Sequence, residues 1–245
     1  MSFDAHLLPT ARPGSGAMFD RIAGRYDQLN RVLSFGLDRS WRRRAVAALE
    51  PASEKRFLDL ATGTADVALE IVRQAPGASV IGIDPSPGML IHGRRKLETA
   101  GVTGVELERG EAERLPFDDD SFDGAIIAWG IRNVVDRPAG LAEMARVVRP
   151  GGRAVVLEAN EPRGGLVAPF ARFYMRRVVP WLGSVLAGAP REYRYLQRSI
   201  KAFPPPDEFA ELLRDAGLEL LRSELLTFGV TGLFVATPHV DGGGV

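Results

Sequence analysis

Short apolar runs alternate with longer amphipathic segments between Arg56 and Glu158. The apolar runs predict strands at residues 56–61, 79–84, 105–110, 122–129 and 152–159. The amphipathic segments carry apolar residues at helical spacing and predict helices at residues 66–74, 89–100 and 139–148. Strands that are nearly continuously apolar and alternate with helices are typical of a parallel sheet covered on both faces. The pattern therefore predicts an α/β, doubly wound, mostly parallel fold.

The remaining segments complete one domain at 18–240. Residues 207–216 predict a further helix that ends before Gly217, and residues 218–224 and 231–238 predict two closing strands. The segment 163–201 is basic and rich in aromatic residues, which predicts a helical lid or substrate insertion over the strand ends. We expect residues 18–50 to form an N-terminal helical cap. The tails 1–17 and 241–245 are rich in small and turn-forming residues and are expected to be disordered.

Composition excludes several classes of chemistry. The chain has 31 Lys+Arg against 31 Asp+Glu, no cysteine and three histidines. Neutral net charge argues against nucleic acid as a partner. The lack of cysteine excludes a thiolate nucleophile, and the scattered histidines make a metal site improbable, so we expect no metal. The N-terminal residues lack the features of a signal peptide, and the longest uncharged run, 178–190, is too short for a membrane span, which together predict a cytoplasmic protein.

Three turns follow consecutive predicted strands and carry candidate cofactor-binding residues. The first strand contains Asp59 and leads into a small-residue turn with Gly63 and Thr64, where helix N–H groups could meet a ligand. The second ends at Asp84, which could accept both hydroxyls of a ribose or simply cap the next helix. The third leads into a turn with Glu111 and Ala112, which could flank an adenine.

In combination, these turns resemble class I S-adenosylmethionine-dependent methyltransferases. The resemblance implies a seven-stranded sheet whose last strand runs antiparallel, with S-adenosyl-L-methionine as cofactor. It also implies a further contact to the cofactor from Ala128, at the end of the fourth strand, and from Tyr26, in a segment that folds over the cleft.

Motifs outside the sheet are more specific. They are MFDRIAGRYDQLN at 18–30, LSFGL at 33–37, WGIRNV at 129–134, VPWLG at 179–183 and YRYL at 193–196. Together they resemble the ubiquinone/menaquinone biosynthesis C-methyltransferase family over almost the whole chain. The resemblance implies methylation of a ring carbon in a polyprenyl quinol, with demethylmenaquinol as the favoured substrate.

The reaction predicts roles for residues beside the cofactor. Aromatic carbon becomes nucleophilic when a ring hydroxyl loses its proton, and Arg132 is the first candidate to lower the pKa of that hydroxyl while water takes the proton. Asn133 could orient the water or a quinol oxygen. Asp27 is an alternative base or orienting group. The sequence leaves open that Arg132 pairs with a structural carboxylate and that Tyr26 and Asp27 only anchor the N-terminal helix.

The substrate-binding residues are expected to be Trp129, Tyr193 and Tyr195, with Tyr195 favoured as the one that lines the pocket. The chain departs from the family pattern at several positions, namely Ala65, Glu111, Ala128, Trp129, Ala189 and Glu192. The departures at Ala128, Trp129, Ala189 and Glu192 keep open a C- or O-methyltransferase of another phenolic acceptor. A non-catalytic cofactor-binding subunit of a quinone-synthesis complex is a separate alternative, against which the presence of Asp84, Arg132 and Asn133 argues. The aromatic basic stretch predicts peripheral contact with a membrane surface. A homodimer is left open.

Overall fold

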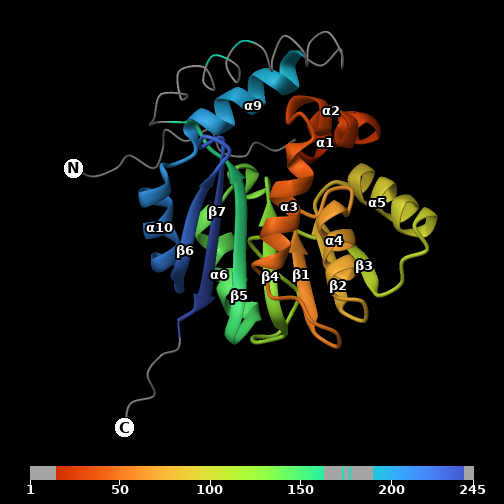
Figure 1. The fold of residues 1–245 in the computed structure, drawn as a ribbon, viewed down its shortest axis with the longest axis vertical. Coiled ribbons are helices and arrows are strands. Elements are labelled where there is room, and N and C mark those ends of the chain that lie inside the picture. Colours follow the sequence, from red (N-terminus) through yellow and green to blue (C-terminus); the bar gives the residue numbers. More distant parts are fainter. Residues whose placement is uncertain (1–14, 163–172, 174–176, 178–189, 240–245) are drawn as a thin grey trace.

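A seven-stranded sheet organises the chain in the computed structural model, which describes residues 15–162, 173, 177 and 190–239. The strand order is β3-β2-β1-β4-β5-β7-β6, and β7 alone runs opposite in direction to the other strands (Figure 1). The strands are β1 (Arg56–Leu60), β2 (Ser79–Asp84), β3 (Val105–Arg109), β4 (Phe122–Ala128), β5 (Val148–Ala159), β6 (Leu218–Leu226) and β7 (Thr231–Pro238). This topology confirms the predicted fold, including its antiparallel last strand.

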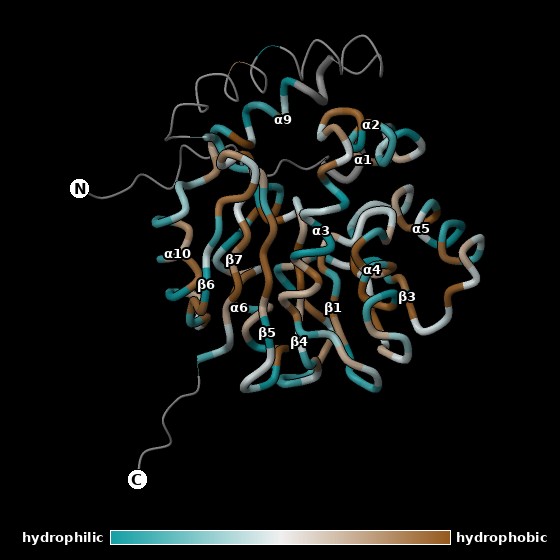
Figure 2. The backbone as a smooth tube through the Cα atoms, in the orientation of Figure 1, coloured by the Kyte–Doolittle hydropathy of each residue, from teal (hydrophilic) through white to brown (hydrophobic). Residues whose placement is uncertain are grey.

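Helices cover both faces of the sheet because the strands bury side chains on both. One face carries α3 (Leu37–Ala47), α4 (Asp66–Gln74) and α5 (Pro87–Thr99). The other carries α6 (Arg137–Val147) and α10 (Pro206–Asp215). Alternation along β1 illustrates the two cores, since Phe57 packs in the first and Leu58 in the second. Figure 2 shows the central strands as predominantly hydrophobic.

Most predicted boundaries agree with the structure to within a few residues. The helix at 66–74 and the strands at 79–84 and 231–238 have the predicted limits. Strand β5 begins at Val148 rather than near Gly152, because α6 passes directly into the strand and the pairing with β4 shifts register between Phe122 and Gly124.

The carboxyl ends of the strands are covered by elements from both ends of the chain. The N-terminal elements here are α1 (Ser15–Ile22), the 3₁₀ turn η2 (Ala23–Arg25) and α2 (Tyr26–Leu33), which we call the cap (Figure 1). Helix α3 instead joins the layer on the sheet face, where Ala45 and Val46 are fully buried. From the C-terminal half, α9 (Pro190–Ala202) crosses above the strand ends.

The expected lid at 163–201 lies largely outside the described residues, apart from positions 173 and 177 and the part that belongs to α9. The expected tails at 1–17 and 241–245 also lie outside them, except for the first residues of α1. Within the described ranges, no helix combines the length and the apolar composition needed to cross a membrane.

Candidate active site

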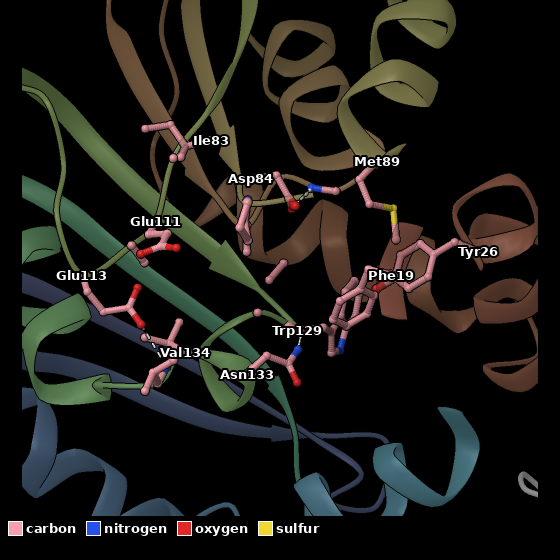
Figure 3. A pocket seen from close by; sticks show the side chains of 18 residues that line it. Phe19, Tyr26, Ile83, Asp84, Met89, Glu111, Glu113, Trp129, Asn133 and Val134 are labelled. Carbon is pink, nitrogen blue, oxygen red and sulfur yellow. Dashed lines mark hydrogen bonds between the residues drawn. The ribbon is translucent and has the colours of Figure 1, made fainter. Parts of the chain in front are cut away.

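A cleft opens where β1, β2 and β4 end, on either side of the point at which the strand order reverses. Ligands of open α/β sheets bind at such a reversal, because neighbouring loops diverge there. The cleft encloses about 870 Å³ of space that is partly open to solvent. It is lined by Phe19, Tyr26, Ala61, Gly63, Ile83, Asp84, Pro85, Met89, Gly110, Glu111, Ala112, Glu113, Ala128, Trp129, Gly130, Asn133, Val134 and Val135. Figure 3 shows Glu111 and Glu113 across the cleft from Phe19 and Tyr26.

Asp84 lies at the end of β2 and is 7% exposed. Its Oδ2 accepts the Gly63 N–H at 2.8 Å, and its Oδ1 accepts the Ser86 N–H at 2.9 Å. Burial raises the pKa of this carboxyl above its ordinary value, and the two backbone donors oppose that rise. Asp84 lines the cleft and each of its oxygens retains a further lone pair, so Asp84 can accept a pair of ligand hydroxyls. Helix capping, which the sequence left open for Asp84, is done by Ser86, whose hydroxyl accepts the Met89 N–H at 3.1 Å.

The turn between β1 and α4 is shaped by left-handed residues. Ala61, Gly63 and Ala65 have φ values of 51°, 57° and 65°. Nothing lies within 4 Å of the position of a Cβ on Gly63, so the backbone is open to a ligand there. Ala65 is fully buried and keeps the left-handed conformation that costs a non-glycine residue about 1–2 kcal/mol. The departure from glycine at this position therefore leaves the shape of the turn intact.

Asp59 supports this turn from beneath and is not among the residues that line the cleft. Its Oδ2 accepts the Thr62 hydroxyl at 2.5 Å and the Ala68 N–H of α4 at 3.2 Å. Asp59 is 1% exposed, and burial raises the pKa of its carboxyl to about 7. The side chain that the sequence singled out thus acts on the turn through Thr62 and α4.

The turn after β3 forms the wall opposite the cap. A Cβ on Gly110 would lie 2.7 Å from Ile83 Cγ2, so only glycine lets this turn approach β2. Glu111 and Ala112 line the cleft, and their role beside a ligand ring stays a prediction. Sequence reasoning missed Glu113, whose Oε1 accepts the Val135 N–H at 2.9 Å and so ties this turn to the loop after β4.

The end of β4 supplies the aromatic part of the cleft. Ala128 and Trp129 both line it, and Trp129 has a φ of 54°. The guanidinium carbon of Arg42 lies 5.5 Å from the centre of the Trp129 ring, within range of a cation–π contact. Asn133 also lines the cleft, and its Oδ1 accepts the Tyr195 hydroxyl of α9 at 3.0 Å. Trp129, Asn133 and Tyr195 are therefore brought together, whereas the side chain of Tyr193 lies outside the described residues.

Arg132 lies behind this part of the cleft rather than on its surface. Its Nη1 donates to Glu158 Oε1 at 2.5 Å and to the Trp129 carbonyl at 2.6 Å, and Glu158 is fully buried. Burial opposes the charge of Arg132, yet Glu158 raises the pKa of the guanidinium above its ordinary value. The pairing with a carboxylate is the alternative that the sequence left open. Sequence reasoning missed Glu158, although an acid within an apolar strand was a signal for it.

The cap brings Phe19 and Tyr26 to the cleft, with their rings edge to face at 6.1 Å. Burial raises the pKa of the Tyr26 phenol, and the nearby Arg132 guanidinium opposes that rise. Asp27 points elsewhere: its Oδ1 accepts the Thr64 hydroxyl at 2.6 Å and its Oδ2 accepts Lys96 at 2.5 Å. Neither Asp27 nor Thr64 lines the cleft. These contacts correspond to the anchoring role that the sequence left open for Asp27.

The cleft fits S-adenosyl-L-methionine on the chemistry of its donor set. A buried carboxylate at the end of β2 can hold the ribose hydroxyls, and the open backbone at Gly63 admits the amino-acid part of the cofactor. Glu111 and Ala112 line the cleft and could border an aromatic base. Fold and cleft together define a class I methyltransferase that depends on S-adenosyl-L-methionine.

Comparison with known proteins identifies the family within this class to which the chain belongs. The model of the ubiE/COQ5 methyltransferase family matches residues 11–238, and the chain belongs to this family. It is 48% identical over 218 residues to a demethylmenaquinone methyltransferase of Thermus thermophilus, covering 89% of this chain and 98% of that protein. It is 46% identical over 221 residues to a ubiquinone/menaquinone biosynthesis C-methyltransferase of Geobacter sulfurreducens, covering 89% and 85%.

Solved structures share the fold at much lower identity. The [4+2]-cyclase SpnF has a TM-score of 0.68 at 16% identity, covering 92% of this chain and 95% of that one. A methyltransferase of Thermotoga maritima has a TM-score of 0.60 at 21% identity, covering 90% and 98%. Because one of these two proteins is a cyclase, the fold alone does not specify the reaction.

Proposed function

We propose that this chain methylates a ring carbon of demethylmenaquinol, using S-adenosyl-L-methionine. The relatives in Thermus thermophilus and in Deinococcus radiodurans, 48% and 44% identical, are both named demethylmenaquinone methyltransferase. Relatives in Geobacter carry the broader ubiquinone/menaquinone name, so a benzoquinol is the second substrate to test.

One observation carries the proposal: a single cleft runs from Asp84 to Trp129 and Asn133. The Asp84 end fits the cofactor, and the other end offers aromatic and aliphatic surface together with one amide. A quinol ring is flat and apolar, with polar oxygens at its edge. The aromatic side chains of Trp129 and Phe19 suit the face of such a ring, and Asn133 suits an oxygen at its edge.

The cofactor supplies an electrophilic methyl group on a sulfonium sulfur. The chain must therefore hold the ring, exclude water and stabilise the phenolate that makes the ring carbon nucleophilic. The Tyr195 hydroxyl fixes the Asn133 amide by donating to Oδ1, which leaves Nδ2 as the donor towards a quinol oxygen. One Nδ2 hydrogen is available, because the amide nitrogen carries two and its contact with the Trp129 carbonyl, at 3.4 Å, uses only one.

Arg132 acts on the phenolate from behind the surface of the cleft. Its charge is partly balanced by Glu158, but Arg137 adds a second guanidinium, since both arginines interact electrostatically with Glu158 and Tyr195. The cluster holds two cations and one carboxylate, so it presents net positive charge to the cleft. Such a field lowers the pKa of a bound quinol hydroxyl, and a water molecule then takes the proton.

The decisive experiment is a methyl-transfer assay with labelled S-adenosyl-L-methionine. Reduced short-chain demethylmenaquinone, a reduced demethoxy-type benzoquinone and a soluble naphthol serve as acceptors side by side. Label on carbon of the naphthoquinol supports the proposal. Label on the soluble naphthol alone, or on oxygen, favours another phenolic acceptor. Tight cofactor binding with no label on any acceptor contradicts the proposed substrate class.

Arg132→Ala tests the role of the guanidinium separately. The proposal requires S-adenosylhomocysteine to bind with nearly unchanged affinity while turnover falls at least about a hundredfold, which corresponds to about 2.7 kcal/mol of transition-state stabilisation. Unchanged methylation of the quinol would remove Arg132 from the mechanism. It would also argue against a non-catalytic subunit, because turnover would be intact.

We also propose peripheral contact with a membrane surface, because a prenyl tail is hydrocarbon and needs an apolar environment. The basic candidates Arg172 and Arg176 lie outside the described residues, and Arg177 is exposed. In a flotation assay the protein should move to the top fraction with anionic liposomes, and the variant Arg176→Glu/Arg177→Glu should remain unbound in the bottom fraction. Both proteins staying in solution would contradict this contact.

A further inference from the structure

Lys96 of α5 joins three elements through its ammonium group. Nζ donates to Asp27 Oδ2 of α2 at 2.5 Å, to Asp66 Oδ1 of α4 at 2.6 Å and to the Thr64 hydroxyl of the β1–α4 turn at 2.9 Å. Thr64 in turn donates to Asp27 Oδ1 at 2.6 Å. The side chains of Lys96, Asp27 and Asp66 are 27%, 29% and 27% exposed, so these ion pairs are largely shielded from water.

The two carboxylates are close because they share one cation. Asp27 Oδ2 and Asp66 Oδ1 lie 2.5 and 2.6 Å from the same nitrogen, so these oxygens are no more than 5.1 Å apart. Arg42 contacts Asp66 at 3.1 Å but forms no ion pair with Asp27 within the described part of the chain. Without the ammonium of Lys96, Asp27 would lose its cation and face the like charge of Asp66, and only the electrostatic interactions of Asp66 with Arg42 and Arg31 would oppose that repulsion.

A second carboxylate attaches the cap to the turn after β2. Asp20 Oδ1 of α1 accepts the Ser86 hydroxyl at 2.5 Å and the Gly88 N–H at 2.8 Å. A Cβ on Gly88 would lie 2.7 Å from Asp20 Oδ1 and 3.1 Å from Asp20 Cα, so only glycine lets α1 come this close. Ser86 also donates its N–H to Asp84, which connects this contact to the proposed ribose carboxylate.

The two attachments fall on the two turns that form the cofactor end of the cleft. Phe19 and Tyr26, which line the cleft, each lie next to an attachment residue in the sequence (Figure 3). We infer that Lys96 and Asp20 are positioning residues that latch the cap over S-adenosyl-L-methionine. Release of the cofactor then requires the cap to open, so these residues control the dissociation rate of a ligand that they do not touch.

Lys96→Met tests the attachment that Lys96 forms between the cap and the turn after β1, because methionine keeps the length of the side chain and removes its charge. We expect the Kd for S-adenosylhomocysteine to rise about tenfold, equivalent to 1.4 kcal/mol, chiefly through faster dissociation. Trypsin should cleave after Arg25 and Arg31 faster than in the wild type when no ligand is present. Lys96→Arg keeps a cation and should restore most of the affinity and protection.

Matched controls separate the latch from a general effect of charge. Lys55→Met removes a lysine before β1, at the opposite end of the sheet, and should leave both readouts unchanged. Asp20→Asn should weaken S-adenosylhomocysteine binding severalfold and expose the cap to trypsin. The matched Asp215→Asn removes an exposed carboxylate at the end of α10 and should do neither.

The outcomes decide the inference without any quinol. Faster cleavage together with a higher Kd supports the latch. Faster cleavage with an unchanged Kd would mean that the cap is attached here but does not hold the cofactor. A higher Kd with unchanged cleavage, or no change in either readout, would equally overturn it. Because the assay uses S-adenosylhomocysteine alone, its result is independent of the proposed quinol substrate.

Discussion

The buried carboxyl of Asp59 should make the stability of the protein depend on pH. Its pKa rises from an ordinary value of 3.8 to about 7 in the folded chain, chiefly because burial disfavours the charged form. Below pH 3.8 the carboxyl is protonated in both states and carries no penalty. Between that pH and about 7 only the unfolded chain ionises, so the folded state loses stability as the pH rises.

The size of the effect follows from the pKa shift. At about 1.4 kcal/mol per pKa unit, the penalty is about 1.7 kcal/mol at about pH 5 and about 4.3 kcal/mol at about pH 8. Asp59→Asn removes the ionisation. Its amide oxygen can still accept from Thr62 and Ala68 as Oδ2 does now. The variant should therefore gain about 2.6 kcal/mol relative to the wild type between the two pH values.

Thermal unfolding in the absence of cofactor measures this gain. For a chain of this size we expect the difference in Tm between variant and wild type to increase by about 5–10 °C from about pH 5 to about pH 8. Asp215→Asn, at an exposed position of α10, gives the baseline for loss of a carboxylate. A difference in Tm that is the same at both pH values would refute the reasoning, because the folded chain would then not hold the proton on Asp59.

Three further substitutions test other parts of the site. Glu158→Gln leaves Arg132 buried without its negative partner and should cost about 3 kcal/mol in urea unfolding; a loss below about 1 kcal/mol would show that the pair adds little. Gly130→Ala would place a Cβ 2.6 Å from Ala61 Cβ, so it should lower the free energy of unfolding by about 1–3 kcal/mol and weaken S-adenosylhomocysteine binding. Wild-type stability and affinity would mean that the two strand ends can separate freely. Asp84→Ala should weaken that binding at least about tenfold in calorimetry, and an unchanged Kd would place the ribose elsewhere.

The fold could be predicted largely from the sequence because each strand carries its own signal. Val80, Ile81 and Ile83 form a run that is buried on both faces, and such runs separated by amphipathic helices admit few topologies. The start of β5 could not be predicted in this way. The turn Pro150–Gly152 indicates an interruption, yet pairing with β4 extends the strand through it.

The candidate site was predictable where its residues lie within a strand-turn unit and not where they meet across the chain. Asp84 ends β2 and Glu111 closely follows β3, and these strands end at the same edge of the sheet, so their convergence follows from the parallel pairing alone. The partners of Asp27 and Arg132 lie 69 and 26 residues away, at Lys96 and Glu158. The sequence around either residue does not identify its partner, because an ion pair between two elements depends on how those elements pack together.

Two strand ends that border the cleft hold non-glycine residues in left-handed conformations. Ala61 after β1 and Trp129 after β4 both have left-handed φ values, 51° and 54°, on the two strands that flank the reversal of strand order. Each conformation costs about 1–2 kcal/mol, and such strain persists only where the surrounding structure enforces it. Gly130 lies against Ala61, and both line the cleft, so small side chains let the two turns meet at its floor. A larger residue at either position would crowd the other turn and bring additional side-chain atoms into the lining of the cleft.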